Sequence, residues 1–432
     1  MRFLAAVVLL GCPPAFAGPL TFEQAVDRTI ERNERAKISH LNTTASQARL
    51  SQARAFFFPT LGVGANYTRQ GWAAVSAGGQ PLVVQEPNAL SAVAAARWTV
   101  FDARGIPLYR AAARELEATK LESADSRRLL AFEAGDAFLQ TLSSQAVVDA
   151  ARRRVDFAQQ AVKDSGSRQA AGLVSVNDVT RAQLEAATAE RELTRATSTA
   201  ETARIQLAWL LDAAPGELDA LERPAALLET AASASPELSA QALAKAQDSR
   251  LDVAAAVARA AQAGALSDEP NARLFPTLSL VAQYRLTNEP GLSGRVGGGS
   301  FGVDLAWALF DGGDRYGERR QRLAEAQSAS LQARLRQRKV AFDVQAALVS
   351  LKSAQASLAQ AKVASDVAQK NATETEELYR QGLASTLQVA DASLRRFEAE
   401  VELARGQYGL ALSLLDLRAA IGVDPLGREV TP

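Results

Sequence analysis

The side chains that most often perform chemistry are scarce in this sequence. His40 is the only histidine and Cys12 the only cysteine, so no disulfide can form within the chain, and His40, in a polar helical stretch, is expected at the surface. Residues 297–299 are three glycines without the spacing or the lysine of a phosphate loop, and residues 311–314 lack the remaining carboxylates of a calcium loop. We therefore expect no catalytic residues, no metal site and no cofactor, and hence no enzyme.

The composition favours long, thinly packed helices. Alanine, leucine, glutamine, arginine and glutamate recur throughout, and these side chains lose little rotamer freedom in a helix. Aromatic residues make up only 6%, which suits close packing of helix on helix better than a large globular core. Lys+Arg and Asp+Glu both number 48, so no basic excess points to a nucleic acid as partner.

The N-terminus reads as an export signal. Residues 1–17 combine Arg2, an apolar run and the small-residue site that ends at Ala17, which predicts a signal peptide cleaved after Ala17. In the alternative, residues 9–12 serve as a lipoprotein cleavage box and Cys12 becomes the acylated N-terminus. No later segment offers the run of about 20 apolar residues that a membrane helix requires.

The rest of the chain is a duplication. Residues 57–61 (Phe-Phe-Pro-Thr-Leu) return as 274–278 (Leu-Phe-Pro-Thr-Leu), 98–102 (Trp-Thr-Val-Phe-Asp) as 307–311 (Trp-Ala-Leu-Phe-Asp), and 172–175 (Gly-Leu-Val-Ser) as 382–385 (Gly-Leu-Ala-Ser). The three matches keep their order at a spacing of about 210 residues. Two tandem repeats are therefore predicted, each running helix, strand, strand, long helix, helix.

These patterns give approximate bounds for each part. The first repeat is expected at residues 18–212, with strands at about 60–70 and 90–101, a long helix at about 106–164 and a return helix at about 176–211. A linker is expected at 213–235. The second repeat, 236–422, has strands at about 276–287 and 300–310, a long helix at about 313–381 and a return helix at about 386–421, followed by a tail at 423–432.

The predicted strands alternate between apolar and polar residues with a period of two. Alternation over about ten residues between Gly-rich loops is typical of a transmembrane β-strand, but a half-buried sheet in a soluble protein shows it too. Trp98 and Trp307, at matching strand-to-helix junctions, favour the membrane because aromatic residues gather at its interfaces. In a barrel, Arg97 and Asp304 would face the aqueous lumen.

Four strands cannot close a barrel, and an open edge in hydrocarbon leaves backbone groups unpaired at several kcal/mol each. Several chains must therefore share one barrel. Two copies would give about eight strands around an interior filled by side chains, whereas three would give about twelve around a lumen. Three is the smallest number of copies that conducts.

The long helices are too long for a compact domain. At 1.5 Å per residue they would extend on the order of 90–100 Å. Leu335, Phe342 and Val349 repeat at steps of seven, the spacing of a coiled coil. The return helices bring the chain back, which leaves the turns at the far end.

These features together resemble the TolC-type outer-membrane efflux proteins over essentially the whole mature chain. The resemblance rests on the duplicated strand starts, the paired Trp-x-x-Phe-Asp strand ends and the two Gly-Leu-x-Ser turns. It implies a homotrimer in the outer membrane of a Gram-negative bacterium, with a 12-stranded β-barrel continuous with a 12-helix periplasmic α-barrel. Such a duct passively conducts drugs, small molecules or secreted polypeptides.

The resemblance also implies partners and the residues that meet them. A periplasmic membrane-fusion adaptor would dock on the turns and link the channel to an inner-membrane pump. Carried over by position, the docking residues are Gly172, Leu173, Val174 and Ser175, together with Gly382, Leu383, Ala384 and Ser385. In the plain alternative these are ordinary turn residues.

A gate at the same tip is implied as well. Asp178 and Tyr379 match a hydrogen-bonding pair, and Asp391 matches one carboxylate of a ring; Gln388 stands in place of a second carboxylate and Ala384 in place of an arginine. Three copies of Asp391 around a narrow lumen would repel one another and attract cations. Asp391 as a solvated residue of a helix face is the alternative.

The main rival interpretation is a non-conducting periplasmic coiled-coil scaffold or adhesin whose hairpins pack as soluble sheet. A channel that serves protein secretion instead of small-molecule efflux is a second. The sequence does not separate efflux from secretion.

Overall fold

The computed structural model describes residues 19–69, 88–218, 220–235, 240–289 and 295–431, and it is dominated by helices. The predicted signal peptide, Cys12 and most of the loop between the first two predicted strands lie outside these residues. The chain divides into two compact units that cut across the repeats: one holds residues 40–123 and 251–337, the other residues 1–39, 124–250 and 338–432. We call them the sheet unit and the hairpin unit.

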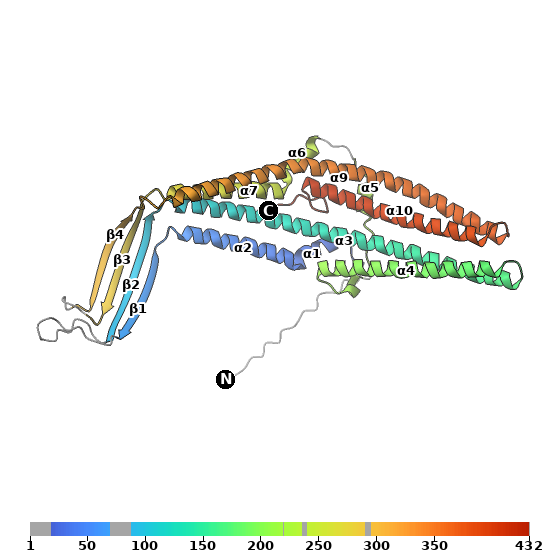
Figure 1. The fold of residues 1–432 in the computed structure, drawn as a ribbon, viewed down its shortest axis with the longest axis horizontal. Helices are drawn as coiled ribbons and strands as arrows, with labels where there is room; N and C mark the ends of the chain where they lie inside the picture. Colours follow the sequence, from blue (N-terminus) through green and yellow to red (C-terminus); the bar gives the residue numbers. More distant parts are fainter. Residues whose placement is uncertain (1–18, 70–87, 219, 236–239, 290–294, 432) are drawn as a thin grey trace. The chain divides into compact units, whose positions relative to one another are not determined.

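The sheet unit contains one antiparallel sheet in the order β1 (Thr60–Arg69), β2 (Asn88–Phe101), β3 (Thr277–Thr287) and β4 (Gly297–Ala306). Each repeat contributes one β-hairpin, and the two β-hairpins join through β2 and β3. The edges of the sheet are therefore β1 and β4 (Figure 1). Arg97 of β2 lies opposite Thr60 on one side and Val281 on the other. β4 begins earlier than the sequence suggested because Gly297 and Gly298 pair with Leu286 and Arg285.

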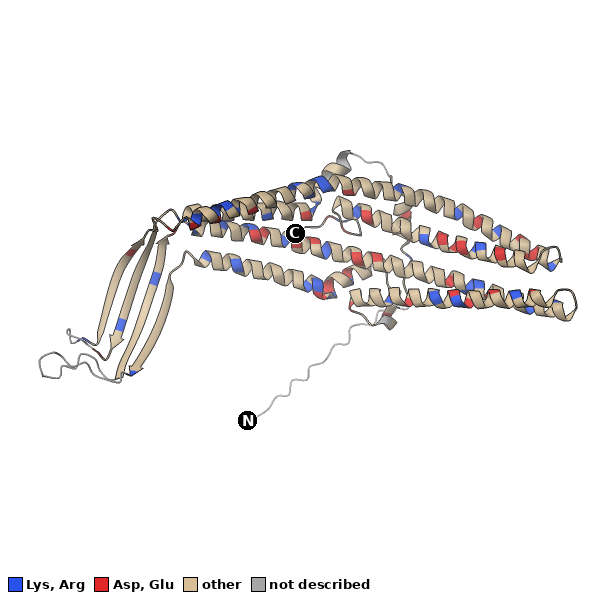
Figure 2. Ribbon diagram, in the orientation of Figure 1, with Lys and Arg blue, Asp and Glu red and all other residues tan. Residues whose placement is uncertain are grey.

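The register gives the sheet two unlike faces. One face is apolar, and its members include Leu61, Val63, Leu90, Leu280, Leu286, Phe301, Val303 and Leu305. The opposite face carries glycine, serine, threonine and the charged residues Arg97, Arg285 and Asp304. Figure 2 shows how few charges the strands carry compared with the helices.

Four helices start or end beside the strands: α2 (Glu34–Ala55), α3 (Gly105–Ala170), α8 (Glu269–Ala272) and α9 (Asp314–Arg380). Only the first part of α3 and of α9 belongs to the sheet unit. α2 and α3 meet closely, since a Cβ at Gly105 would lie 2.8 Å from the rings of Phe56 and Phe57. α7 (Leu251–Ser267) leads into α8, where Glu269 is buried and pairs with Arg273 at 2.9 Å. These contacts fix the helix ends next to the sheet.

The hairpin unit is built on α3 paired with α4 (Val176–Leu211) and α9 paired with α10 (Thr386–Ile421). Alanine lines the seam of α3 and α4: Ala151, Ala196 and Ala200 cluster with Val148, and Ala158, Ala186 and Ala189 with Val155. Small side chains let helix axes approach closely. The largest fully buried side chains of the unit include Phe138, Leu207, Leu351, Leu410 and Leu415.

α1 (Phe22–Arg32) begins with a capping box: Gln24 N donates to Thr21 Oγ1 and Thr21 N to Gln24 Oε1. The first helix that the repeat pattern predicted is divided in two at Asn33, whose extended backbone ends α1 and whose side-chain amide donates to Leu210 O at 3.0 Å. The second repeat has the matching contact, from Ser249 Oγ to Ile421 O at 2.6 Å. Each repeat thus ties its helix break to the end of its return helix.

The segment between the repeats, expected as a linker, contains two helical pieces, η1 (Pro215–Leu218) and α5 (Ala225–Ser233), before α6 (Ala240–Ser249). α5 packs against α10 and buries Leu227 and Ala231, which are one helical turn apart. Two buried residues on so short a helix make a weak pattern in the sequence. Pro215 and Pro224, which are typical of loops, therefore predicted a linker instead. Among the described residues, no helix is both long and apolar enough to cross a membrane.

Candidate functional site

The two turns of the hairpin unit share one geometry. Gly172 and Gly382 have φ of 74° and 80°, a conformation that glycine adopts without the strain of a Cβ. At the first turn Gly172 N donates to Gln169 O and Leu173 N to Arg168 O, both at 2.9 Å. Gly382 and Leu383 repeat this pattern with the carbonyls of Tyr379 and Leu378. These are the paired bonds of a Schellman helix end.

The position of the glycine decides where each long helix stops. The sequence suggested an end near residue 164 because of Gly166, but α3 continues to Ala170. Of these two glycines, Gly166 is part of the helix and Gly172 takes the positive φ that ends it. The return helices then start at once with capping boxes, Ser175 with Asp178 and Ser385 with Gln388.

The predicted docking residues present an apolar tip. Leu173 and Leu383 are 75% and 72% exposed, and they follow the two positive-φ glycines. Val174 and Ala384 lie between these leucines and the capping serines. Each turn therefore offers one large apolar side chain on a rigid backbone.

The predicted gate residues Asp178 and Gln388 act locally in this chain. Asp178 Oδ2 accepts from Ser175 N at 3.1 Å and from Ser175 Oγ at 2.9 Å. Gln388 Oε1 accepts from Ser385 N at 2.7 Å. Asp391, whose side chain is 55% exposed, pairs with Arg395 one turn along α10 at 2.8 Å. That hydrogen bond raises the pKa of Arg395.

Tyr379 is the one predicted gate residue that is buried, at 7% exposure. Within the described residues its hydroxyl has no hydrogen-bond partner, so no bond joins it to Asp178 of the same chain. Its ring instead lies under the guanidinium of Arg168, with 4.3 Å from Arg168 Cζ to the ring centroid. Arg168 also donates to the carbonyls of Tyr379 and Arg380, at 2.8 and 3.2 Å.

Arg168 therefore joins the end of α3 to the end of α9, a role that the repeated motifs did not predict. Two helix-end carbonyls carry partial negative charge, which favours a cation there. A signal did exist, because the position that matches Arg168 in the second repeat is Leu378. The tip is thus asymmetric between repeats.

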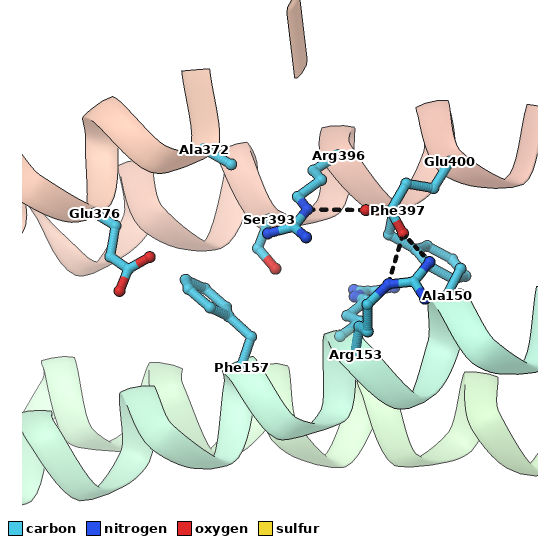
Figure 3. Close-up of a pocket in the computed structure, with 10 residues that line it drawn as sticks. Ala150, Arg153, Phe157, Ala372, Glu376, Ser393, Arg396, Phe397 and Glu400 are labelled. Carbon is cyan, nitrogen blue, oxygen red and sulfur yellow. Dashed lines mark hydrogen bonds and ion pairs between the residues drawn. The ribbon is translucent and has the colours of Figure 1, made fainter. Parts of the chain in front are cut away.

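A second cluster, also unforeseen, joins α3 to α10 (Figure 3). The carboxylate of Glu400 accepts from Arg153 at 2.6 Å and from Arg396 at 2.9 Å, and it is 17% exposed. The neighbouring Arg154 pairs with Glu185 of α4 at 2.6 Å, and its guanidinium lies 5.1 Å from the ring of Phe397. Charge-assisted bonds of this kind hold the helix pair α3–α4 against the helix pair α9–α10 of the same chain.

Elsewhere in the hairpin unit, Asp136 of α3 lies near two other carboxylates, those of Asp416 and Glu133. Desolvation of its carboxylate raises the pKa of Asp136 to about 6, and the negative charges of Asp416 and Glu133 add to the effect. Burial likewise raises the pKa of Asp416. Glu133 is itself paired with Arg35.

In the sheet unit, Arg97 and Asp304 lie on the same face of the sheet, and their charged groups approach to 3.7 Å. Trp98 and Trp307 mark the ends of β2 and β4. Trp98 Nε1 donates to Phe57 O at 3.1 Å, and Trp307 Nε1 donates to Leu274 O at 3.0 Å. The duplication seen in the sequence thus extends to matched hydrogen bonds at the two junctions.

Comparison with known proteins identifies the family. The family model of outer membrane efflux proteins matches residues 25–212 and 242–423, one segment for each repeat. The chain belongs to this family. No curated protein sequence matches it.

Solved structures of outer membrane proteins share the fold of this family member. VceC of Vibrio cholerae is 19% identical with a TM-score of 0.78, and the match covers 93% of this chain and 96% of VceC. The CmeC outer membrane channel of Campylobacter jejuni is 15% identical with a TM-score of 0.81, over 95% and 87% of the two chains. The MtrE outer membrane channel of Neisseria gonorrhoeae, solved in its open state, is 18% identical with a TM-score of 0.75, over 95% and 91%.

Proposed function

We propose that three copies of this efflux-family protein form an outer-membrane exit duct that conducts solutes passively. The observation that carries the proposal is the sheet of a single chain. Among the described residues no further strand pairs with its edges β1 and β4, and its apolar face is open, with Leu61 84% and Phe301 73% exposed. An open edge and an apolar face of this kind need both lipid and further strands. Pairing β1 of one copy with β4 of the next supplies them.

Three copies give twelve strands, enough to surround a lumen. The face that carries Arg97, Arg285 and Asp304 would line that lumen, and the apolar face would meet lipid. α3, α4, α9 and α10 of three copies supply the twelve helices of the periplasmic tube. The 66 residues of α3 and 67 of α9 make each helix about 100 Å long.

The turns with exposed Leu173 and Leu383 are the proposed docking sites for a periplasmic adaptor, which would link the duct to an inner-membrane pump. Two rigid turns of like geometry in each copy would present six apolar contacts in a trimer. An adaptor helix hairpin could bury them. The gate near these turns would use Asp391, Asp178, Gln388 and Tyr379, with Arg168 holding α3 to α9.

The trimer and the membrane are tested together on detergent-purified protein. We expect a mass about three times that of one 45.8 kDa chain after correction for detergent, and conductance when the protein is added to planar bilayers. A monomer, or release from washed membranes by high salt without detergent, would instead favour the periplasmic scaffold or adhesin.

A further inference from the structure

The arginines next to the sheet fall into two sets. In the first set each arginine has a carboxylate partner: Arg104 with Asp102 at 2.6 Å, Arg273 with Glu318 at 2.7 Å and Arg315 with Asp311 at 2.9 Å. The second set comprises Arg54, Arg110, Arg319 and Arg320, which are all exposed. In the described part of the chain no carboxylate lies within ion-pair distance of any of these four. We call this second set the arginine collar.

The duplication places the collar at matching positions. Arg110 is the sixth residue of α3, counted from Gly105, and Arg319 is the sixth residue of α9, counted from Asp314. Each lies about 7.5 Å along its helix from the first helical residue. Arg54 lies in the last turn of α2, on the other side of the same junction in the first repeat.

Contacts within the sheet unit bring the collar close to the aromatic residues of the junction. Phe57 N donates to Arg54 O at 3.2 Å, so Arg54 is one turn from Phe57. The ring of Phe57 meets that of Tyr109, the neighbour of Arg110, at 6.4 Å between centroids. In the second repeat Arg320 Nε donates to the carbonyl of Tyr316, itself 56% exposed, at 3.4 Å. Aromatic residues and arginines without a carboxylate partner in the described chain therefore adjoin in both repeats.

The aromatic residues themselves are open to solvent in the single chain. Those exposed at the ends of the strands include Phe57, Phe58, Trp98, Phe101, Phe275, Trp307 and Phe310. Aromatic rings of this kind mark the level of lipid headgroups. A guanidinium about one to two helical turns beyond them is within reach of headgroup height, because arginine can keep its aliphatic stem on apolar surface and its charged end in a polar layer.

We propose that the arginine collar binds the phosphate groups of anionic glycerophospholipids in the leaflet on the helix side of the sheet. The planar guanidinium binds phosphate oxygens in pairs, and each basic residue at an anionic lipid surface adds to binding. This inference rests on the proposed membrane insertion of the sheet. The collar then sets how deeply the sheet enters the membrane and which lipids surround it.

The test measures lipid preference from the two junction tryptophans. Full-length protein with Trp72→Phe and Trp209→Phe retains only Trp98 and Trp307. It is reconstituted in phosphatidylcholine vesicles that contain either brominated phosphatidylglycerol or brominated phosphatidylcholine, whose bromines quench nearby tryptophan. We expect stronger quenching by phosphatidylglycerol at low salt, up to about fivefold in association for each arginine engaged, and a smaller difference at high salt.

A triple variant, Arg54→Gln/Arg110→Gln/Arg319→Gln, should lose most of the preference for phosphatidylglycerol, because only Arg320 of the collar remains. The matched control, Arg127→Gln/Arg195→Gln/Arg334→Gln, removes the same charge from three exposed arginines that also lack a carboxylate partner among the described residues. It should keep the preference of the parent. Loss of the preference in the control would show that net charge, not the collar, selects the lipid.

Three other outcomes overturn the inference in distinguishable ways. Equal quenching of the parent by both lipids would show that the collar does not select anionic lipid, although the sheet does enter the membrane. No quenching by either lipid means that the sheet does not enter the membrane, so the proposed function fails. A triple variant that loses the trimer in detergent would show that the collar pairs with carboxylates of neighbouring copies.

Discussion

At the scale of the residue, the tip depends on a few side chains with special backbone or burial. Gly172 and Gly382 hold positive φ, and Tyr379 buries a ring against Arg168 with no partner for its hydroxyl in the described chain. Each of these residues could act by stabilising the turn or by taking part in export. Substitutions can therefore test the two roles one at a time.

Gly172→Val or Gly382→Val should abolish adaptor-dependent export while trimers remain. Apart from its chain neighbours, no described residue has an atom within 4 Å of a Cβ built at either position, so the cost is backbone strain, about 1–2 kcal/mol at one turn. Drug tolerance of a strain that lacks its own channel measures export. Gly166→Val, in a helical stretch with open space, is the control and should remain functional. Unchanged tolerance in both turn variants would count against docking at the turns.

Tyr379→Leu should make the closed channel leak, because it removes the ring on which Arg168 stacks, an interaction of about 0.5–2 kcal/mol. Tyr379→Phe keeps the ring and should behave like the parent. Single-channel recording in planar bilayers measures the closed fraction. If the Phe variant leaks as much as the Leu variant, the hydroxyl makes a bond in the trimer, and Asp178 of a neighbouring copy becomes the expected acceptor.

Asp391→Ala should lower cation selectivity, since each copy loses a carboxylate and leaves Arg395 without its partner. Asp391→Asn keeps the shape and should have the same effect if charge is the cause. The reversal potential across a salt gradient is the measurement. An unchanged reversal potential in both variants would take Asp391 out of the gate.

At the scale of the element, helix pairing in the hairpin unit combines alanine seams with a few charged groups. Asp136 is the least favourable of these, because its raised pKa of about 6 means that folding penalises the charged form. The folded state then holds a proton that the unfolded chain releases near pH 3.8. Stability is highest below that pH, falls as the pH rises to about 6, and is constant above.

Asp136→Asn should therefore raise the thermal midpoint by an amount that depends on pH. The gain should be small near pH 4, grow up to pH 6 and level off above pH 7, as followed by circular dichroism. The residue as a whole is solvent-exposed in the single chain, so the gain is smaller than the pKa shift alone implies. Asp164→Asn, on the same helix, is the control, and a gain that is equal at all pH values would contradict the assignment.

At the scale of the whole molecule, the open edges of the sheet decide the assembly. β1 and β4 lie three strand spacings apart in one chain, about 14 Å, which exceeds the reach of a disulfide. A disulfide between them must therefore join different copies. That makes the edge pairing directly testable.

A cysteine at Val63 of β1, combined in turn with Phe301→Cys, Val303→Cys or Leu305→Cys of β4, should give covalent dimers and trimers on oxidation. These four positions lie on the apolar face, and one of the three combinations should match the register between copies. Denaturing gels without reductant show the products. Single-cysteine variants are the control, and monomers alone in all three combinations would exclude β1–β4 pairing.

The sequence by itself determined the features that depend on local pattern. Alternation with a period of two predicted the apolar and polar faces of β1 and β3, because side chains of a strand alternate whatever its neighbours. The repeated motifs predicted two copies of one helix-strand-strand-helix-helix unit, and the family match to 25–212 and 242–423 agrees. The capping box at Thr21 was also readable, since its two residues are three apart.

Only the tertiary structure decided which residues far apart in the chain meet. The stacking of Arg168 on Tyr379 joins positions 211 residues apart, and Arg153 meets Glu400 across 247. It also decided that Gly172 and not Gly166 ends α3, and that α5 packs against α10 between the repeats. No local pattern encodes such contacts, because they depend on how four helices pack together.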